Sequence, residues 1–228
     1  MIVVKRKPIE EILKMIGSAE NVLIVGCDGC AAIYQEGGQK QVDLMKLVLQ
    51  MAKKLKQNKD INIKTAAILR QCDRQICATS LRPLVKKDDV ILSMGCGAGT
   101  QTLAQVFENN TIIPALDTMF IGAQDREQGK LYELCSACGE CILYETGGIC
   151  PITRCAKQLL NGPCGGQSKG KCEVGGWKRD CAWVLIYNRL KDKGRLDLFT
   201  KFREQRDFRI SQSPREIGET EEKTEETP

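Results

Sequence analysis

The spacing of the cysteines constrains this chain more than any other feature. Eight of them fall within fewer than fifty residues: Cys135, Cys138, Cys141, Cys150, Cys155, Cys164, Cys172 and Cys181. The first three form a Cys-x2-Cys-x2-Cys run, and Cys150 is followed directly by Pro151. This spacing is typical of ferredoxin-like segments, in which thiolates bind iron–sulfur clusters. Eight thiolates are enough for two four-ligand metal centres, so the pattern predicts an electron-transfer module.

The 228-residue chain contains no histidine. This excludes zinc sites of mixed cysteine and histidine ligation and every histidine-based acid–base mechanism. We therefore predict no catalytic residue, and we take the eight cysteines as the metal ligands. Two [4Fe–4S] clusters are the preferred interpretation; one cluster plus a zinc ion, or zinc alone, are the alternatives. Structural four-cysteine zinc sites normally show paired Cys-x2-Cys knuckles, whereas this chain has one triple run.

Composition also bears on the cellular compartment. No apolar run approaches the roughly eighteen residues that a membrane span needs, and the first fourteen residues lack a signal-peptide pattern. We expect a cytoplasmic protein, in which thirteen cysteines serve metal ligation better than disulfides. The net charge is +5, yet only 5% of residues are aromatic and no basic run is interleaved with them. This composition argues against nucleic-acid binding and favours an acidic protein partner.

The first part of the chain alternates between two kinds of pattern. Short apolar runs at 21–26, 61–69, 89–94 and 111–120 predict strands, and amphipathic segments at 8–17, 39–56, 73–81 and 98–108 predict helices. Such alternation implies right-handed crossovers and a parallel sheet covered on both faces. We expect an α/β fold: a small Rossmann-like or flavodoxin-like three-layer domain over residues 1–125.

The remainder is expected to divide into three parts. Residues 126–183 form a Cys-rich metal-cluster domain, whose nine glycines between Gly139 and Gly176 leave little for an ordinary core. Metal ligation would supply its folding free energy. Residues 184–210 form a C-terminal helical segment interrupted near Gly194, and the stripe of Trp183, Ile186, Tyr187 and Leu190 is expected to dock on the first domain. Residues 211–228 form an acidic, disordered tail.

A second group of cysteines lies in the first domain. Cys27 and Cys30 follow the first predicted strand, Cys72 and Cys77 follow the second, and Cys96 follows the third. Because ligands bind at the carboxyl ends of parallel strands, these thiols should gather in space. Buried cysteines in tight turns are the preferred interpretation, and a third metal site or a redox pair stays open.

A glycine-rich loop, GCGAGT at 95–100, lies between a predicted strand and a helix. Such a loop can cradle a phosphate, but the G-x-G-x-x-G spacing is missing. Close packing of the helix against the strand is the preferred interpretation.

Several motifs carry a family resemblance. TGGICP at 146–151, NGPCGG at 161–166, G-x-CEV at 170–174 and C-x-W-x-x-IY-x-RL at 181–190 occur in order. Together with GCDGCA at 26–31 and GCGAGTQ at 95–101, they resemble the small iron–sulfur, C-terminal-domain-type subunit of the two-subunit methylenetetrahydrofolate reductases of acetogens and related anaerobes.

The resemblance implies a partner and a role. The partner is a TIM-barrel flavoprotein subunit whose FMN reduces 5,10-methylenetetrahydrofolate to 5-methyltetrahydrofolate. This chain would pass electrons to that flavin from ferredoxin or another cytoplasmic donor, as a component and not a complete catalyst. Its cluster ligands would be the eight cysteines, Cys135 to Cys181, and their division between two clusters stays open. The alternative is a zinc-stapled subunit that docks on the same flavoprotein without transferring electrons.

Overall fold

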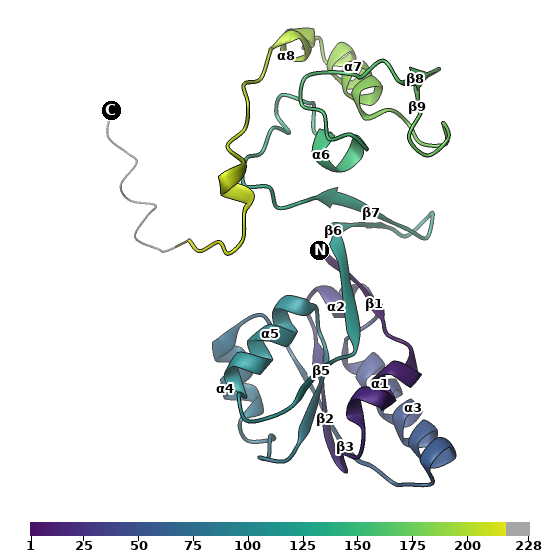
Figure 1. Cartoon of the computed structure of the whole chain (residues 1–228), viewed down its shortest axis with the longest axis vertical. Coiled ribbons are helices and arrows are strands. Elements are labelled where there is room, and N and C mark those ends of the chain that lie inside the picture. Colours follow the sequence, from purple (N-terminus) through teal and green to yellow (C-terminus); the bar gives the residue numbers. More distant parts are fainter. Residues whose placement is uncertain (218–228) are drawn as a thin grey trace. The chain divides into compact units, whose positions relative to one another are not determined.

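The computed structural model describes residues 1–217 of the chain. They separate into two compact units, Met1–Tyr132 and a second that begins at Glu133, and the division falls inside a strand, β7 (Figure 1). The first unit contains β1 (Ile2–Arg6), α1 (Ile9–Ile16), β2 (Asn21–Cys27), α2 (Cys30–Ile33), α3 (Gln39–Gln57), β3 (Asn62–Ile68), α4 (Arg74–Leu81), β4 (Val90–Met94), α5 (Gly97–Val106), β5 (Ile112–Pro114) and β6 (Leu116–Asp125). β7 (Lys130–Cys135) leads into the second unit, which contains α6 (Pro151–Arg154), β8 (Gln167–Ser168), β9 (Lys171–Cys172), α7 (Ala182–Asp192), α8 (Leu196–Thr200) and the 3₁₀ turn η1 (Phe208–Ser211).

The first unit is built on a parallel sheet of four strands in the order β3-β2-β4-β5. The chain enters at β2, adds β3 on one side, and then crosses over to add β4 and β5 on the other. This is the flavodoxin-like strand order, with its topological switch point between β2 and β4. The predicted α/β fold is confirmed.

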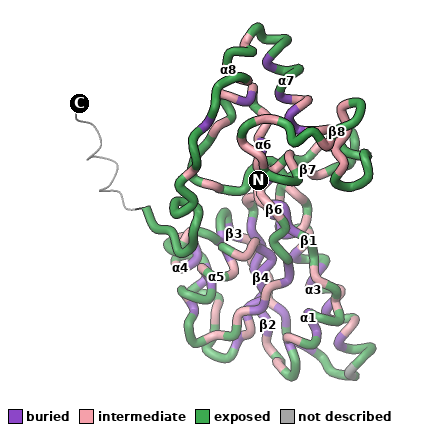
Figure 2. The backbone as a smooth tube through the Cα atoms, turned by 45° about the horizontal axis from the view of Figure 1, so that its top comes forward, coloured by how far each residue is buried: buried purple, intermediate pink, exposed green. Residues whose placement is uncertain are grey.

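Helices cover both faces of this sheet, because successive side chains of a buried strand point to opposite faces. Val22 and Ile24 pack into a core with α1 and α3. Leu23 and Val25 pack into a second core with α4 and α5. The buried strands at the centre of this unit are drawn in purple in Figure 2.

A second sheet, antiparallel and of order β1-β6-β7, is the main departure from the predicted fold. The segment predicted as one strand over 111–120 is two: β5 completes the parallel sheet and β6 pairs antiparallel with β1. The break falls between Pro114, which has no N–H to donate, and Leu116. β1 itself was missed, since five residues at the chain start carry too weak a periodic pattern.

The second unit has little regular structure but does have a core. Trp183, Ile186 and Leu190 of α7 are buried together, against Leu198 and Phe199 near the C-terminal side. The expectation that this stripe docks on the first domain is therefore wrong. The interruption near Gly194 is confirmed, because α7 ends at Asp192 and Gly194 has a φ of 65°.

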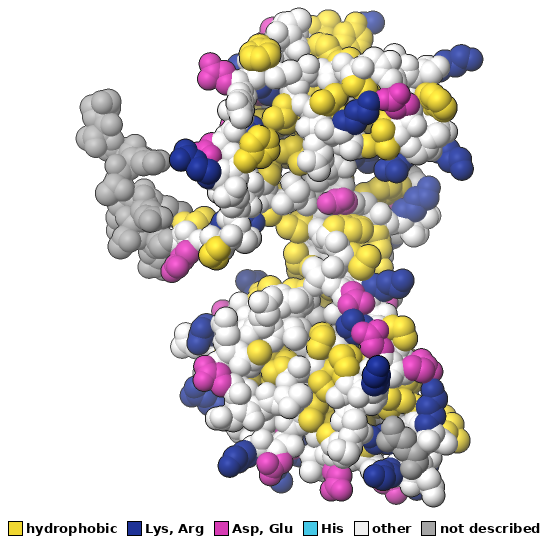
Figure 3. Space-filling model, viewed as in Figure 1, with side chains coloured by type: hydrophobic (Ala, Val, Ile, Leu, Met, Phe, Trp, Pro, Cys, Tyr) yellow, Lys and Arg dark blue, Asp and Glu magenta, His cyan; other side chains and the backbone are white. Residues whose placement is uncertain are grey.

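The small core leaves apolar side chains at the surface of the second unit, where hydrophobic groups are visible in Figure 3. Tyr144 and Phe202 are among the most exposed. In the part of the chain that the structure describes, no helix is both long enough and apolar enough to cross a bilayer. The predicted disorder of 211–228 concerns mainly residues 218–228, which lie outside the described residues.

Candidate metal centre

All eight predicted ligands lie in the second unit, and all are free thiols. Most of them sit at the ends of short elements, where the backbone turns. Cys135 ends β7, Cys172 ends β9, and Cys181 is the residue before α7. Cys150 and Cys155 flank the two ends of α6.

Four of the eight thiols line a single enclosed cavity: Cys155, Cys164, Cys172 and Cys181. Trp183 and Lys157 are also among the residues that line it. Gly165 of the NGPCGG motif has a φ of 80°, a conformation that a residue with a Cβ rarely adopts. The sequence identified these four cysteines but did not show that they share one space.

Backbone hydrogen bonds hold the loops that carry these thiols. The Cys181 N–H donates to Gly170 O at 2.8 Å, and the Cys172 N–H donates to Arg179 O at 2.8 Å. β8 pairs with β9 in a two-residue hairpin. Lys157 pairs with the Glu173 carboxylate, and this hydrogen bond, together with the Cys164 thiol, raises the pKa of Lys157. Lys157 and Glu173 therefore form an ion pair beside Cys164.

The other four thiols lie along the Cys-x2-Cys-x2-Cys loop and at the start of α6. Gly139, with a φ of 86°, and Ala137, with a φ of 52°, turn the loop back on itself. The Ala137 N–H donates to Cys135 Sγ at 3.4 Å. Thr153 Oγ1 donates to Leu134 O at 3.3 Å, which ties the helix that follows Cys150 to the residue before Cys135.

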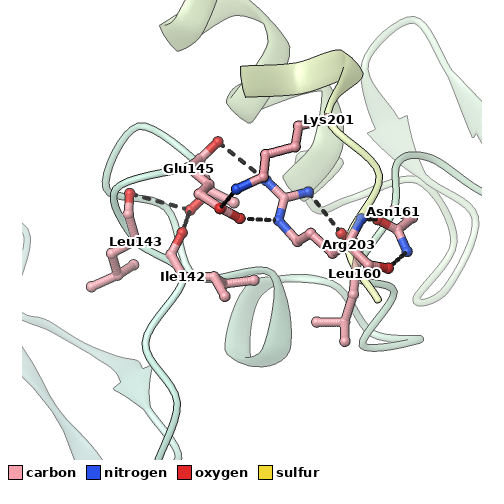
Figure 4. Close-up of polar contacts among 8 residues, drawn as sticks. Ile142, Leu143, Glu145, Leu160, Asn161, Lys201 and Arg203 are labelled. Carbon is pink, nitrogen blue, oxygen red and sulfur yellow. Dashed lines mark hydrogen bonds and ion pairs between the residues drawn. The ribbon is translucent and has the colours of Figure 1, made fainter. Parts of the chain in front are cut away.

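Two arginines of the C-terminal segment, Arg203 and Arg206, bind loops of this unit and so act as a clamp. No local pattern in the sequence predicted these contacts. Arg203 Nε binds Glu145 Oε2 at 2.6 Å, and its Nη1 donates to Leu160 O at 3.1 Å. Figure 4 shows the guanidinium between Glu145, which also binds Lys201, and the Leu160–Asn161 backbone. The hydrogen bond from Lys201 outweighs burial, with help from Arg203, so that the pKa of the Glu145 carboxyl is lowered.

Arg206 reaches the cysteine run itself. Its Nη2 donates to Cys138 O at 3.0 Å and its Nε binds Glu140 Oε2 at 3.1 Å, while the side chain is buried. Burial opposes ionisation of the Cys138 thiol, but hydrogen bonds from Arg206 and the backbone outweigh it and lower the pKa of Cys138. The only signal in the sequence was the spacing of Arg203, Arg206 and Arg209 at every third residue.

Comparison with known proteins bears directly on this unit. Residues 113–209 match a family described as "Methylene-tetrahydrofolate reductase C terminal". The resemblance to this reductase family is confirmed. The chain matches no curated protein and no solved structure.

The region matched to the reductase C-terminal family begins in β5 and ends in η1. It contains all eight cysteines and both Arg203 and Arg206. The parallel strands β2, β3 and β4 lie outside it. Across residues 1–217, no group of three or more Cys, Asp and Glu side chains is close enough together to hold a single metal ion.

The cysteines of the first unit do come near one another. The thiols of Cys96 and Cys27, together with burial as the main cause, raise the pKa of Cys72. Cys77 is fully buried and its Sγ donates to Gln71 O at 3.1 Å. Burial, with the nearby Asp73 carboxylate, raises the pKa of Cys77 to about 11. Cys77 is therefore a protonated structural thiol, as the interpretation of buried cysteines in turns requires.

The glycine loop at 95–100 packs against Gln71. A Cβ on Gly95 would lie 2.4 Å from Gln71 Oε1, and one on Gly99 would lie 2.7 Å from Gln71 Cβ. Gln71 donates to Val25 O and accepts from Ser93 Oγ, and Thr118 Oγ1 accepts from the Gly97 N–H. These contacts agree with a close packing of α5 against the sheet, and they explain the glycines without a phosphate.

Proposed function

We propose that this chain is the electron-transfer subunit of a methylenetetrahydrofolate reductase and that its eight cysteines bind two [4Fe–4S] clusters. The observation that carries the proposal is the cavity between Cys155, Cys164, Cys172 and Cys181. Four thiolates are the ligand set that one [4Fe–4S] cluster takes, and the Cys-x2-Cys-x2-Cys run without paired knuckles favours clusters over zinc. The clusters would supply one-electron transfer.

The chain's own side chains support that role. Thiolates carry negative charge, and Lys157 and Arg206 place cations beside Cys164 and Cys138. The buried indole of Trp183 keeps water from one side of the cavity. Water exclusion and fixed charge are the means by which a protein sets a reduction potential.

The family match supports a partner of the reductase type. A flavoprotein subunit with FMN would bind the folate and carry out the reduction, and this chain would relay electrons to it from ferredoxin or another cytoplasmic donor. The cofactor would carry the bond-making chemistry, so the chain is a component of the enzyme and not a complete catalyst.

Metal analysis tests the proposal most directly. Protein purified without oxygen should be brown and should contain about eight iron and eight sulfide per chain. Reduction should produce an electron paramagnetic resonance signal. Colourless protein with about two zinc ions per chain and no signal would instead identify the zinc-stapled docking subunit.

Arg206 offers a prediction about potentials. We expect Arg206→Gln to lower the reduction potential of one centre, because removing a buried cation disfavours the more negative, reduced state. At an effective dielectric constant of about 20, the reduction potential should fall by on the order of 60 mV, which is about 1.4 kcal/mol for one electron. Redox titration followed by paramagnetic resonance measures it. Arg209→Gln is the matched control, since Arg209 is solvent-exposed, and equal shifts in both variants would contradict the prediction.

A further inference from the structure

The cavity described above is a closed set of four thiols. Its lining contains Cys155, Cys164, Cys172 and Cys181, and none of the four cysteines that precede them in the chain. Four is the number of thiolates that one [4Fe–4S] cluster requires. The last four cysteines therefore match, in number, the thiolates of one cluster.

Hydrogen bonds join the loops that carry Cys164, Cys172 and Cys181 to one another. The Glu173 N–H donates to Gly166 O at 2.9 Å, which joins the loop after Cys164 to the loop after Cys172. The β-bridge between Lys171 and Asp180 joins the residues preceding Cys172 and Cys181. Both contacts lie between residues 166 and 180, outside the Cys-x2-Cys-x2-Cys loop.

The helix α6 separates the two groups of cysteines. Cys150 lies before its first residue and Cys155 after its last. Four residues of helix rise by about 6 Å, so the two thiols leave from opposite ends. Only the second lines the cavity, while the Thr153–Leu134 hydrogen bond ties the first turn of α6 to the start of the cysteine run.

We propose that Cys155, Cys164, Cys172 and Cys181 hold one cluster and that Cys135, Cys138, Cys141 and Cys150 hold the other. This division rests on the proposed function. In two-cluster bacterial ferredoxins, the cysteine before proline ligates the cluster opposite to its own run. That interleaved arrangement would place Cys150 with Cys155, Cys164 and Cys172, and Cys181 with the first run. The cavity contradicts it, because Cys181 lines it and Cys150 does not.

Pairs of substitutions distinguish the two arrangements. The full chain carrying Cys→Ser changes is purified without oxygen, and iron, sulfide and zinc are measured per chain. Each single variant, Cys150→Ser, Cys164→Ser or Cys181→Ser, should keep about half of the wild-type iron. Cys164→Ser with Cys181→Ser should keep the same half, because both belong to one centre. Cys150→Ser with Cys164→Ser should lose nearly all of it.

The opposite pattern would overturn the division. If the Cys150/Cys164 pair keeps half of the iron and the Cys164/Cys181 pair loses it all, the clusters are interleaved. The centre that survives in each half-loaded variant serves as the control for folding, since its paramagnetic signal must match one component of the wild type. Cys72→Ser, an exposed thiol of the first unit, should keep all the iron.

The same measurement separates this proposal from the proposed function. Should the wild-type chain hold two zinc ions and no iron, the electron-transfer role fails. The division of the ligands is then tested by zinc content. Cys164→Ser with Cys181→Ser should keep one zinc ion and Cys150→Ser with Cys164→Ser should keep none, because four thiolates suffice for one zinc ion as well.

Discussion

Trp183→Ala is expected to destabilise the second unit by about 3–5 kcal/mol and to expose its thiol-lined cavity to water. Trp183 is 1% exposed, its Nε1–H donates to Leu159 O at 3.0 Å, and its ring meets Phe199 edge-on. The indole joins the core of this unit to the wall of the cavity, because it belongs to both. Its truncation should leave a large void where the structure can collapse only in part.

Two measurements check this expectation. Thermal or denaturant unfolding reports the loss of stability, and the rate of iron release to a chelator reports the opening of the cavity. A loss of even 1.4 kcal/mol in local stability raises the open population about tenfold, so iron release should accelerate at least tenfold.

The other tryptophan of the chain is the matched control. Trp177 is 55% exposed and lies outside the buried core. Of the two tryptophans, only Trp183 lines the cavity. Trp177→Ala should therefore leave iron release near the wild-type rate. If both variants release iron equally fast, the shielding role of Trp183 is wrong.

Arg203→Ala is expected to cost about 2–3 kcal/mol of the unfolding free energy. The Arg203 side chain is 8% exposed and its fork binds Glu145 and the Leu160 carbonyl. Removal would leave the carboxylate partly desolvated, which is the costly way to break a buried ion pair. We place the cost below the usual range for buried pairs because Glu145 is 21% exposed and keeps its bond to Lys201.

Denaturant unfolding of matched variants measures this cost. Arg203→Lys should recover only part of the loss, because a lysine cannot reproduce the two-pronged geometry of the guanidinium. Arg209→Ala is the control: Arg209 is 85% exposed, and its removal should change stability by no more than about 0.5 kcal/mol. Equal losses in Arg203→Ala and Arg209→Ala would show that the clamp contributes nothing.

Local sequence patterns were sufficient to predict most of the strands and helices of the first unit. Asn21–Cys27 is an unbroken apolar run, and Gln39–Gln57 repeats apolar residues at helical spacing. Burial on both faces of a parallel strand and on one face of a helix leaves these marks in any sequence. The sequence of β1 shows no comparable pattern, since this strand forms by pairing with β6, more than a hundred residues away.

Local spacing likewise predicts that the eight thiols are ligands. Thiolates at short intervals, in a chain without histidine, leave few other chemistries. Spacing says nothing, however, about which thiols meet, because loops between ligands can close in several ways. Arg206 was invisible for the same reason: its contact with Cys138 spans 68 residues.

The amino-acid sequence by itself determined the α/β character of the first unit, the cysteine spacing that predicts metal ligation in the second, and the resemblance of residues 113–209 to the reductase C-terminal family. Only the tertiary structure decided that four particular thiols share a cavity, that α6 separates them from the rest, and that the α7 stripe packs inside its own unit. The physical reason is the distance along the chain between the residues that each feature involves. Periodicity and ligand type are properties of neighbouring residues, whereas a cavity and its charges are made by segments that meet only when the chain has folded.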